Sequence, residues 1–139
     1  MPVSVRSVVL VSALVAGVAA ADPTGRVIAP AADDALVLSS APDTTHPDWG
    51  LRSGADAAGV YRSFVRLPLP RSVEIVSAVL ELGYAQFASL GPGGQIIDFV
   101  PDDSWSQETL TWNDQPNISE RIGTIIESSN AGPLSIDVT

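Results

Sequence analysis

The sequence predicts an all-β fold, a sandwich of short strands. Short apolar runs alternate with clusters of Gly, Pro, Asp and Ser along residues 22–139. No window of this region keeps an apolar stripe at helical spacing for three turns, whereas several windows show the period of two that is typical of a strand. Seven or eight short strands at this spacing indicate a β-sandwich.

The first part of this region predicts short strands separated by a long loop. Residues 35–38, Ala-Leu-Val-Leu, form an apolar strand that residues 39–42 end. Residues 42–50 carry two prolines and a glycine, which exclude regular structure. Residues 51–53 predict a short strand, and residues 54–59 predict a flexible hairpin loop.

Residues 61–67 predict a strand with two different faces. Successive side chains of a strand point to opposite sides, so Arg62, Phe64 and Arg66 share one face. The next strand is predicted over residues 76–84, with its leucine side toward the core. Three further strands are predicted at residues 95–100, 122–126 and 134–138.

Residues 1 to about 21 are expected to be a secretory signal peptide outside the fold. Arg6 gives the positive start, residues 8–20 form an apolar run, and small residues around Ala21 offer a cleavage site. The run is shorter than the roughly 20 residues that cross a bilayer, which disfavours a membrane anchor. We therefore expect a secreted, extracellular protein with no membrane partner after cleavage.

Composition narrows the class of protein and the class of partner. Residues 22–139 make a single domain by size, large enough to bury a core without covalent staples. The chain has no cysteine, which excludes disulfides. Its formal charge is −9. An acidic surface repels phosphate backbones, so nucleic acid is not an expected partner.

Two of the three tryptophans lie in residues 105–116, Trp-Ser-Gln-Glu-Thr-Leu-Thr-Trp-Asn-Asp-Gln-Pro, which we call the signature segment. Leu110, Thr111 and Trp112 favour a strand, and Asn-Asp-Gln-Pro favours a turn after it. The segment therefore predicts a loop, a strand and a turn. Its two large rings are expected to anchor the β-domain.

Four blocks of the sequence carry a resemblance to a known family. They are residues 32–37, residues 42–50, residues 62–67 with 73–82, and the signature segment. The last is similar to a motif that reads Trp-Ser-Glu-x-x-Val-Thr-Trp-Asn-Asn-x-Pro and is the most specific. The chain thereby resembles the DNRLRE-domain family, secreted β-sandwich modules related to the carbohydrate-binding modules of alginate lyases. We expect an antiparallel, jelly-roll-like β-sandwich.

The sequence departs from that family at several positions. Gln107 stands where the motif usually has Glu, and Trp49 stands where Tyr is more usual. Residues 134–139 resemble a strand after which a helical turn and one more strand normally follow. We therefore expect the domain over residues 22–139 to be C-terminally truncated, to lack its last strand and to expose a sheet edge. Further domains of a longer chain are expected partners.

Two tryptophan environments are expected. Trp49 lies on a loop where its ring should be partly exposed, so it is a candidate for stacking on a sugar. Trp105 and Trp112 could also stack on sugars, but the family pattern favours core packing for both.

Three arginines complete the candidate ligand site. Guanidinium groups pair bidentately with carboxylates, so Arg62 and Arg66 could clamp uronic acids. Arg52 would add to this site if it lies over the same face as Trp49. The alternative for Arg62 and Arg66 is a surface pair with acids such as Glu81 on the neighbouring strand.

Metal and catalytic sites have weaker support. A single histidine, His46, and the absence of cysteine exclude a zinc site, and no serine triad can be assembled. No cofactor is expected other than structural calcium, which loop carboxylates can bind. Solubility and turn formation are more common reasons for such aspartates. The weak calcium candidates are Asp33, Asp34, Asp102 and Asp103.

The function predicted from these observations is a non-catalytic carbohydrate-binding or surface-attachment module. Its expected partner is an extracellular polysaccharide, with uronate content as the finer expectation. The alternative is a purely structural spacer or adhesin module of a larger secreted protein. A fragment of a polysaccharide-degrading enzyme is less favoured because the glutamates are scattered rather than paired.

Overall fold

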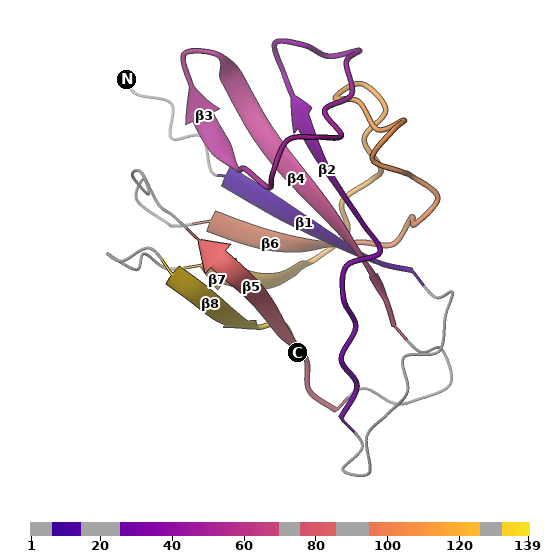
Figure 1. Ribbon diagram of the computed structural model, residues 1–139, viewed down its shortest axis with the longest axis vertical. Coiled ribbons are helices and arrows are strands. Elements are labelled where there is room, and N and C mark those ends of the chain that lie inside the picture. Colours follow the sequence, from indigo (N-terminus) through magenta and orange to yellow (C-terminus); the bar gives the residue numbers. More distant parts are fainter. Residues whose placement is uncertain (1–6, 15–25, 70–75, 86–94, 126–131) are drawn as a thin grey trace.

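The computed structural model describes residues 7–14, 26–69, 76–85, 95–125 and 132–139. These residues form eight strands and no helix, which confirms the predicted all-β fold (Figure 1). Accordingly, no helix in the described ranges is long and apolar enough to cross a membrane. The strands are β1 (Ser7–Leu14), β2 (Asp33–Leu38), β3 (Gly54–Asp56), β4 (Gly59–Pro68), β5 (Val79–Ala85), β6 (Gln95–Val100), β7 (Arg121–Ile125) and β8 (Gly132–Asp137).

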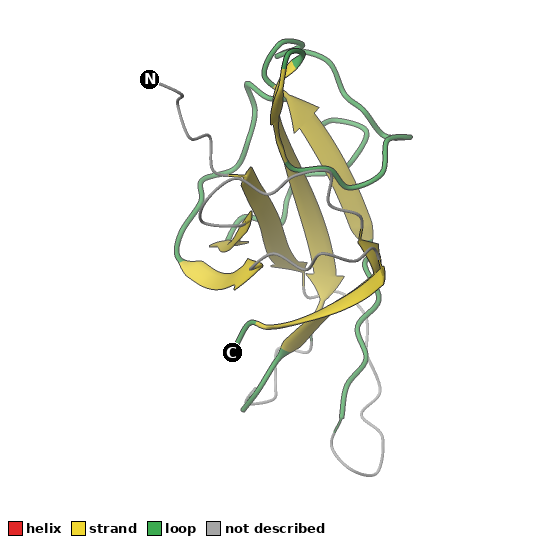
Figure 2. Cartoon of the chain, turned by 90° about the vertical axis from the view of Figure 1, so that its left-hand side faces the viewer, coloured by secondary structure: helices red, strands yellow, loops and turns green. Residues whose placement is uncertain are grey.

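The strands form two sheets of unequal size (Figure 2). The larger sheet has the order β2-β4-β1-β6-β7, with β3 paired to β4, and the smaller sheet consists of β5 and β8. Every pair is antiparallel except that β1 runs parallel to both β4 and β6. A buried cluster joins the smaller sheet to β6 and β7, so the sheets form a sandwich. Its members are Leu80, Ile97, Ile125 and Ile136.

Strand β1 comes from the N-terminal apolar segment. The sequence predicts that residues 1 to about 21 lie outside the fold, yet residues 7–14 occupy the middle of the larger sheet. β1 pairs with β4 over seven residues and with β6 over six. Apolar residues without proline suit a central strand that is paired on both sides. The structure thus includes residues 7–14 in the larger sheet, and the assignment of residues 1 to about 21 as a signal peptide stays a prediction.

The remaining strands follow the predicted pattern with three exceptions. Strands β2, β4, β5, β6, β7 and β8 each overlap a predicted strand. Residues 51–53, predicted as a strand, are not one, and the signature segment contains no strand. Instead β3 forms where a hairpin loop was expected. Gly59, at φ 136°, allows the tight turn into β4, and a Cβ there would lie 2.8 Å from Ser39 Oγ.

A second core lies under β2 and β4. Phe64 is fully buried on β4, on the face that it shares with Arg62 and Arg66. Its neighbours in the core come from β2, from β6 and from the signature segment, so this cluster holds distant parts of the chain together. The members are Ala35, Val37, Phe64, Val100, Trp105 and Leu110.

Candidate ligand-binding site

The signature segment is an irregular loop that lies beside β2 and β4, orange in Figure 1. The Leu110 amide donates to the Ser106 carbonyl at 2.9 Å, and Thr111 Oγ1 donates to Asp114 Oδ2 at 3.0 Å. Leu110 and Thr111 are buried. The apolar pattern that predicts a strand here thus reflects burial in a loop that satisfies part of its polar groups locally.

Arg66 and Asp33 tie the start of this loop to the sheet. Arg66 Nη2 lies 3.2 Å from Asp33 Oδ2. Arg66 Nη1 donates to the backbone carbonyls of Asp103 and Trp105, at 3.2 and 2.6 Å. The side chains of Arg66 and Asp33 are only 18% and 10% exposed. Most of the hydrogen-bonding capacity of Arg66 is therefore used inside the protein.

The Asp33 carboxylate also accepts hydrogen bonds from the amide groups of Gln107. The backbone amide of Gln107 lies 3.3 Å from both carboxylate oxygens. With its side-chain nitrogen turned toward β2, Gln107 also donates to Asp33 Oδ1 and to the Asp34 carbonyl, both at 3.2 Å. A glutamate at position 107 would place a second carboxylate against Asp33. The neutral amide fits this position because it supplies a donor.

Arg62 holds the far end of the same loop. Its Nη1 donates to Gln115 Oε1 at 2.9 Å, and its guanidinium carbon lies 4.7 Å from the ring centroid of Trp112. Arg62 and Arg66 therefore share one face of β4, as predicted, but both contact the loop that covers this face. The acid that pairs with Arg66 is Asp33 on β2 rather than Glu81.

Trp49 and Arg52 lie at the surface. Trp49 lies in a turn in which its backbone amide donates to the His46 carbonyl. The centroids of the Trp49 and His46 rings are 4.4 Å apart. Trp49 is 49% exposed. Arg52 Nη2 lies 2.6 Å from Asp56 Oδ2, and its guanidinium carbon lies 3.9 Å above the Tyr61 ring.

The backbone of Arg52 is fixed to the sheet even though its side chain is exposed. The Arg52 amide donates to Ser63 Oγ at 2.7 Å, and Ser63 Oγ donates back to the Arg52 carbonyl at the same distance. Ser63 is fully buried on β4. The Arg52 guanidinium, whose side chain is 55% exposed, therefore projects from a rigid base.

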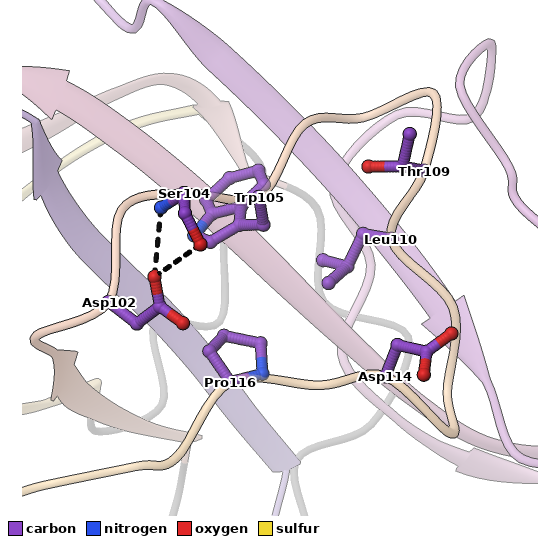
Figure 3. Close-up of a pocket in the computed structure, with 7 residues that line it drawn as sticks. All are labelled: Asp102, Ser104, Trp105, Thr109, Leu110, Asp114 and Pro116. Atoms are coloured by element: carbon purple, nitrogen blue, oxygen red, sulfur yellow. Dashed lines mark hydrogen bonds between the residues drawn. The ribbon is translucent and has the colours of Figure 1, made fainter.

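A pocket of about 310 Å³ lies within the signature segment and the residues just before it. Figure 3 shows the Trp105 ring at the back of this pocket, with carboxylates and hydroxyls around it. Trp105 Nε1 is buried and has no hydrogen-bond partner among the described residues. The lining residues are Asp102, Ser104, Trp105, Thr109, Leu110, Asp114 and Pro116.

Comparison with known proteins identifies the family. The model of carbohydrate-binding module family 96 matches residues 27–139. The chain belongs to this family. Searches of curated proteins and of solved structures returned no match. The expected carbohydrate-binding class is therefore confirmed, and β1 lies outside the residues that family 96 matches.

Two of the four predicted calcium ligands of this family 96 module make contacts with other residues of the protein. Asp33 pairs with Arg66, and Asp102 accepts hydrogen bonds from Ser104. No group of three or more His, Cys, Asp or Glu side chains that could hold a metal ion occurs in the described parts of the chain. Calcium binding stays a prediction from the sequence for Asp33, Asp34, Asp102 and Asp103.

Asp102, at the pocket, is expected to titrate at unusually low pH. Hydrogen bonds from the Ser104 hydroxyl and then from the Ser104 amide lower the pKa of the Asp102 carboxyl. Because the folded pKa is the lower one, the resulting stability is present above the unfolded pKa and lost as pH falls through the folded pKa. We expect Ser104→Ala to raise the Asp102 pKa in an NMR titration of the carboxyl carbons.

Asp137 is the internal control for that titration. Thr139 lowers the pKa of Asp137 through the same kind of side-chain and backbone hydrogen bonds. Its midpoint should not move in the Ser104→Ala variant. An unchanged Asp102 midpoint, or equal movement of both, would contradict the assignment of the shift to Ser104.

The sequence did not point to several residues that build these sites. Tyr61 under the Arg52 guanidinium and Ser63 behind its backbone are strand residues with no unusual sequence context. Gln115, the partner of Arg62, lies 53 residues away in the chain. The one available signal was the face shared by Arg62 and Arg66, which favours a partner for their guanidinium groups.

Proposed function

We propose that this family 96 module binds an extracellular polysaccharide through the surface formed by Trp49 and Arg52, and that it catalyses no reaction on it. The observation that supports this location is the half-exposed ring of Trp49. A flat apolar ring that is left in contact with water can stack on the apolar C–H face of a pyranose. By contrast, Trp105 is 6% exposed and packs in the core.

Arg52 supports the finer proposal that the polysaccharide contains uronic acid. Arg52 lies three residues from Trp49, so their Cα atoms are at most about 11 Å apart. A guanidinium has five N–H donors, and its contacts with Asp56 and Tyr61 leave donors for a ligand carboxylate. Arg62 and Arg66 are weaker candidates because their guanidinium groups bind the signature segment.

Net charge gives this proposal a distinctive salt dependence. The chain carries a formal charge of −9, which opposes a polyanion at long range. At about 0.15 M salt the Debye length is about 8 Å, so distant carboxylates are screened and the contact with Arg52 dominates. We expect retention by a polyuronate at this ionic strength and weaker retention at about 1 M salt. Retention by a neutral glucan that stacks on Trp49 would change little between these two salt concentrations.

Affinity electrophoresis tests the proposed ligand class. The protein is run in gels that contain alginate, pectin or a neutral glucan, beside a reference protein of similar charge. We expect slower migration in the uronate gels and a smaller delay for an Arg52→Met variant. Equal mobility in all gels would overturn the proposal and favour a structural spacer module. Release of reducing or unsaturated ends from any of these polymers would contradict the non-catalytic assignment.

A further inference from the structure

The pocket at the signature segment has the size and the lining of a small ligand site. Its volume of about 310 Å³ lies at the lower end of the roughly 300–1,000 Å³ that ligand pockets usually have. Apolar side chains, Trp105, Leu110 and Pro116, line it together with carboxylates and hydroxyls (Figure 3). A pocket of this size suits one sugar ring rather than a stretch of polymer.

The two arginines of β4 hold the walls of this pocket. Arg66 Nη1 donates to the backbone carbonyls of Asp103 and Trp105, on either side of a lining residue. Arg62 Nη1 donates to Gln115 Oε1, between two further lining residues. The pocket is therefore built on loop segments that are fixed to the sheet, and a fixed pocket loses less conformational freedom when a ligand binds.

Both carboxylates of the pocket keep accepting capacity for a ligand. The amide and the hydroxyl of Ser104 donate to Asp102 Oδ1, at 2.9 and 2.6 Å. Thr111 Oγ1 donates to Asp114 Oδ2 at 3.0 Å. A carboxylate has about four lone-pair sites on its two oxygens and donates no hydrogen bond when ionised. The pocket therefore favours a ligand with several hydroxyl donors.

The indole N–H of Trp105 is the donor on the protein side. Trp105 lines the pocket, and its Nε1 is buried without a hydrogen-bond partner among the described residues. A buried donor is normally satisfied by protein or by ordered water. An oxygen of a sugar in the pocket supplies the missing acceptor after a side-chain adjustment of the kind that is common on binding. A sugar hydroxyl both donates and accepts, so it matches the carboxylates and the indole together.

Charge decides which sugars suit the pocket. No Lys, Arg or His occurs among the described residues that line it. Hydrogen bonds from the hydroxyl and then the amide of Ser104 lower the pKa of the Asp102 carboxyl, which therefore stays ionised at neutral pH. A uronic acid would add a further negative charge beside two carboxylates, and such like-charge contacts are unfavourable.

A calcium ion suits the pocket less well than a sugar. Calcium takes about six to eight oxygen ligands, most of them from carboxylates and carbonyls. Two carboxylates line the pocket, and no group of three or more metal-ligating side chains occurs in the ranges that the structure describes.

We propose that this pocket is a second carbohydrate subsite, which takes one neutral, hydroxyl-bearing sugar residue. This role rests on the proposed binding of a polysaccharide, but not on the contact of that polysaccharide with Trp49 and Arg52. The two subsites have opposite charge preferences, so together they would select a polymer that contains both uronic acid and neutral residues.

The two subsites lie on loops that contact each other. The Asn113 amide donates to the Pro42 carbonyl at 3.0 Å, and Asn113 Nδ2 donates to Asp43 Oδ1 at 2.7 Å. These bonds join the signature segment to residues 42–50, the loop that carries Trp49. A single polysaccharide chain that follows the two loops can therefore reach both subsites.

The indole N–H resonances of the ¹⁵N-labelled full chain test the second subsite. The chain has three tryptophans, and the variants Trp49→Phe and Trp112→Phe assign their resonances. Short oligomers of β-linked glucose, mannose and xylose are the neutral probes, beside alginate oligomers and calcium chloride. We expect the Trp105 resonance to move with at least one neutral oligomer, but not with alginate oligomers or calcium chloride. No movement with any neutral oligomer, or equal movement with calcium chloride, would overturn the subsite.

A matched pair of variants tests the role of the carboxylates. Asp114→Asn replaces a charged acceptor in the pocket by a weaker neutral one, so we expect the midpoint of the Trp105 titration to rise about fivefold. Asp103→Asn makes the same charge change at a residue that is not part of the lining, and its midpoint should stay near the wild type. Equal midpoints for the two variants would contradict the subsite.

The same spectra separate this subsite from the surface of Trp49 and Arg52. If the Trp49 resonance does not respond to alginate oligomers while the Trp105 resonance responds to a neutral oligomer, the uronate surface is wrong and the pocket is supported. The reverse pattern overturns the pocket and supports the uronate surface.

Discussion

Replacement of Trp105 by alanine is expected to destabilise the protein by about 3–5 kcal/mol, the usual cost of removing a large buried ring. Trp105 is 6% exposed and meets Phe64 in an edge-to-face contact with ring centroids 5.9 Å apart. Its ring also lies beside the Arg66 guanidinium. The loss is a large part of the 5–15 kcal/mol that typically separates folded from unfolded states. Urea denaturation, monitored by the fluorescence of the remaining tryptophans, measures this loss in the free energy of unfolding.

Trp49→Ala is the matched control for this variant. It removes the same side chain from a position that is 49% exposed. We expect its free energy of unfolding to change by about 1 kcal/mol or less, because little packing is lost at such a site. Equal destabilisation by the two variants would contradict the division of the tryptophans into a core ring and a surface ring.

Arg66→Met is expected to destabilise the protein by roughly 3 kcal/mol, the low end of the cost of breaking a buried ion pair. Methionine keeps much of the apolar stem but leaves the Asp33 carboxylate without its cation. It also leaves the carbonyls of Asp103 and Trp105 without their donor. This loss should appear in unfolding experiments with no polysaccharide present.

The control for this variant is Arg52→Met. Arg52 also pairs with an aspartate and lies over an aromatic ring, but the side chains of the pair are 55% and 41% exposed. Exposed ion pairs contribute about 0–1 kcal/mol, so the unfolding midpoint should move little. If Arg66→Met left stability unchanged, the assignment of Arg66 to the anchoring of the signature segment would be wrong.

Local sequence patterns predicted most of the strands because a period of two is a local property of the chain. Residues 61–67 show this well, since the alternation placed Phe64 and both arginines on one face of the strand. The same reasoning failed at Leu110 and Thr111. Leu110 is buried by β2 and β4 residues that lie far away in the sequence, and a buried loop residue can have the same apolar character as a strand residue.

The pairing of β1 could not be predicted from the sequence for a different reason. An apolar run near the N terminus fits both a secretory signal and a buried strand, and composition alone does not separate the two. In the structure, residues 7–14 pair with β4 and β6, which lie far away in the sequence. Such long-range pairing has no counterpart in the local pattern of residues 7–14.

The sequence singled out the residues of the candidate site, but it did not predict which of them are exposed and which contact other parts of the protein. The partial exposure expected for Trp49 is confirmed. Arg62 and Arg66 share a face, as expected, but their partners Gln115 and Asp33 lie 53 and 33 residues away in the chain. The chain thus has a buried Trp105–Arg66 pair that supports the fold, while the exposed Trp49 and Arg52 are the residues that we propose for ligand binding.

The most direct test of the proposed binding surface is the affinity of the Trp49→Ala variant for the polysaccharide that retains the wild-type protein. Isothermal titration calorimetry at about 0.15 M salt measures it, with Val79→Ala as the control. Val79 is 60% exposed on the smaller sheet. We predict that Trp49→Ala weakens binding about tenfold or more, the size typical of a central aromatic contact, while its unfolding curve stays near the wild type. Wild-type affinity in the Trp49→Ala variant would contradict the proposed surface.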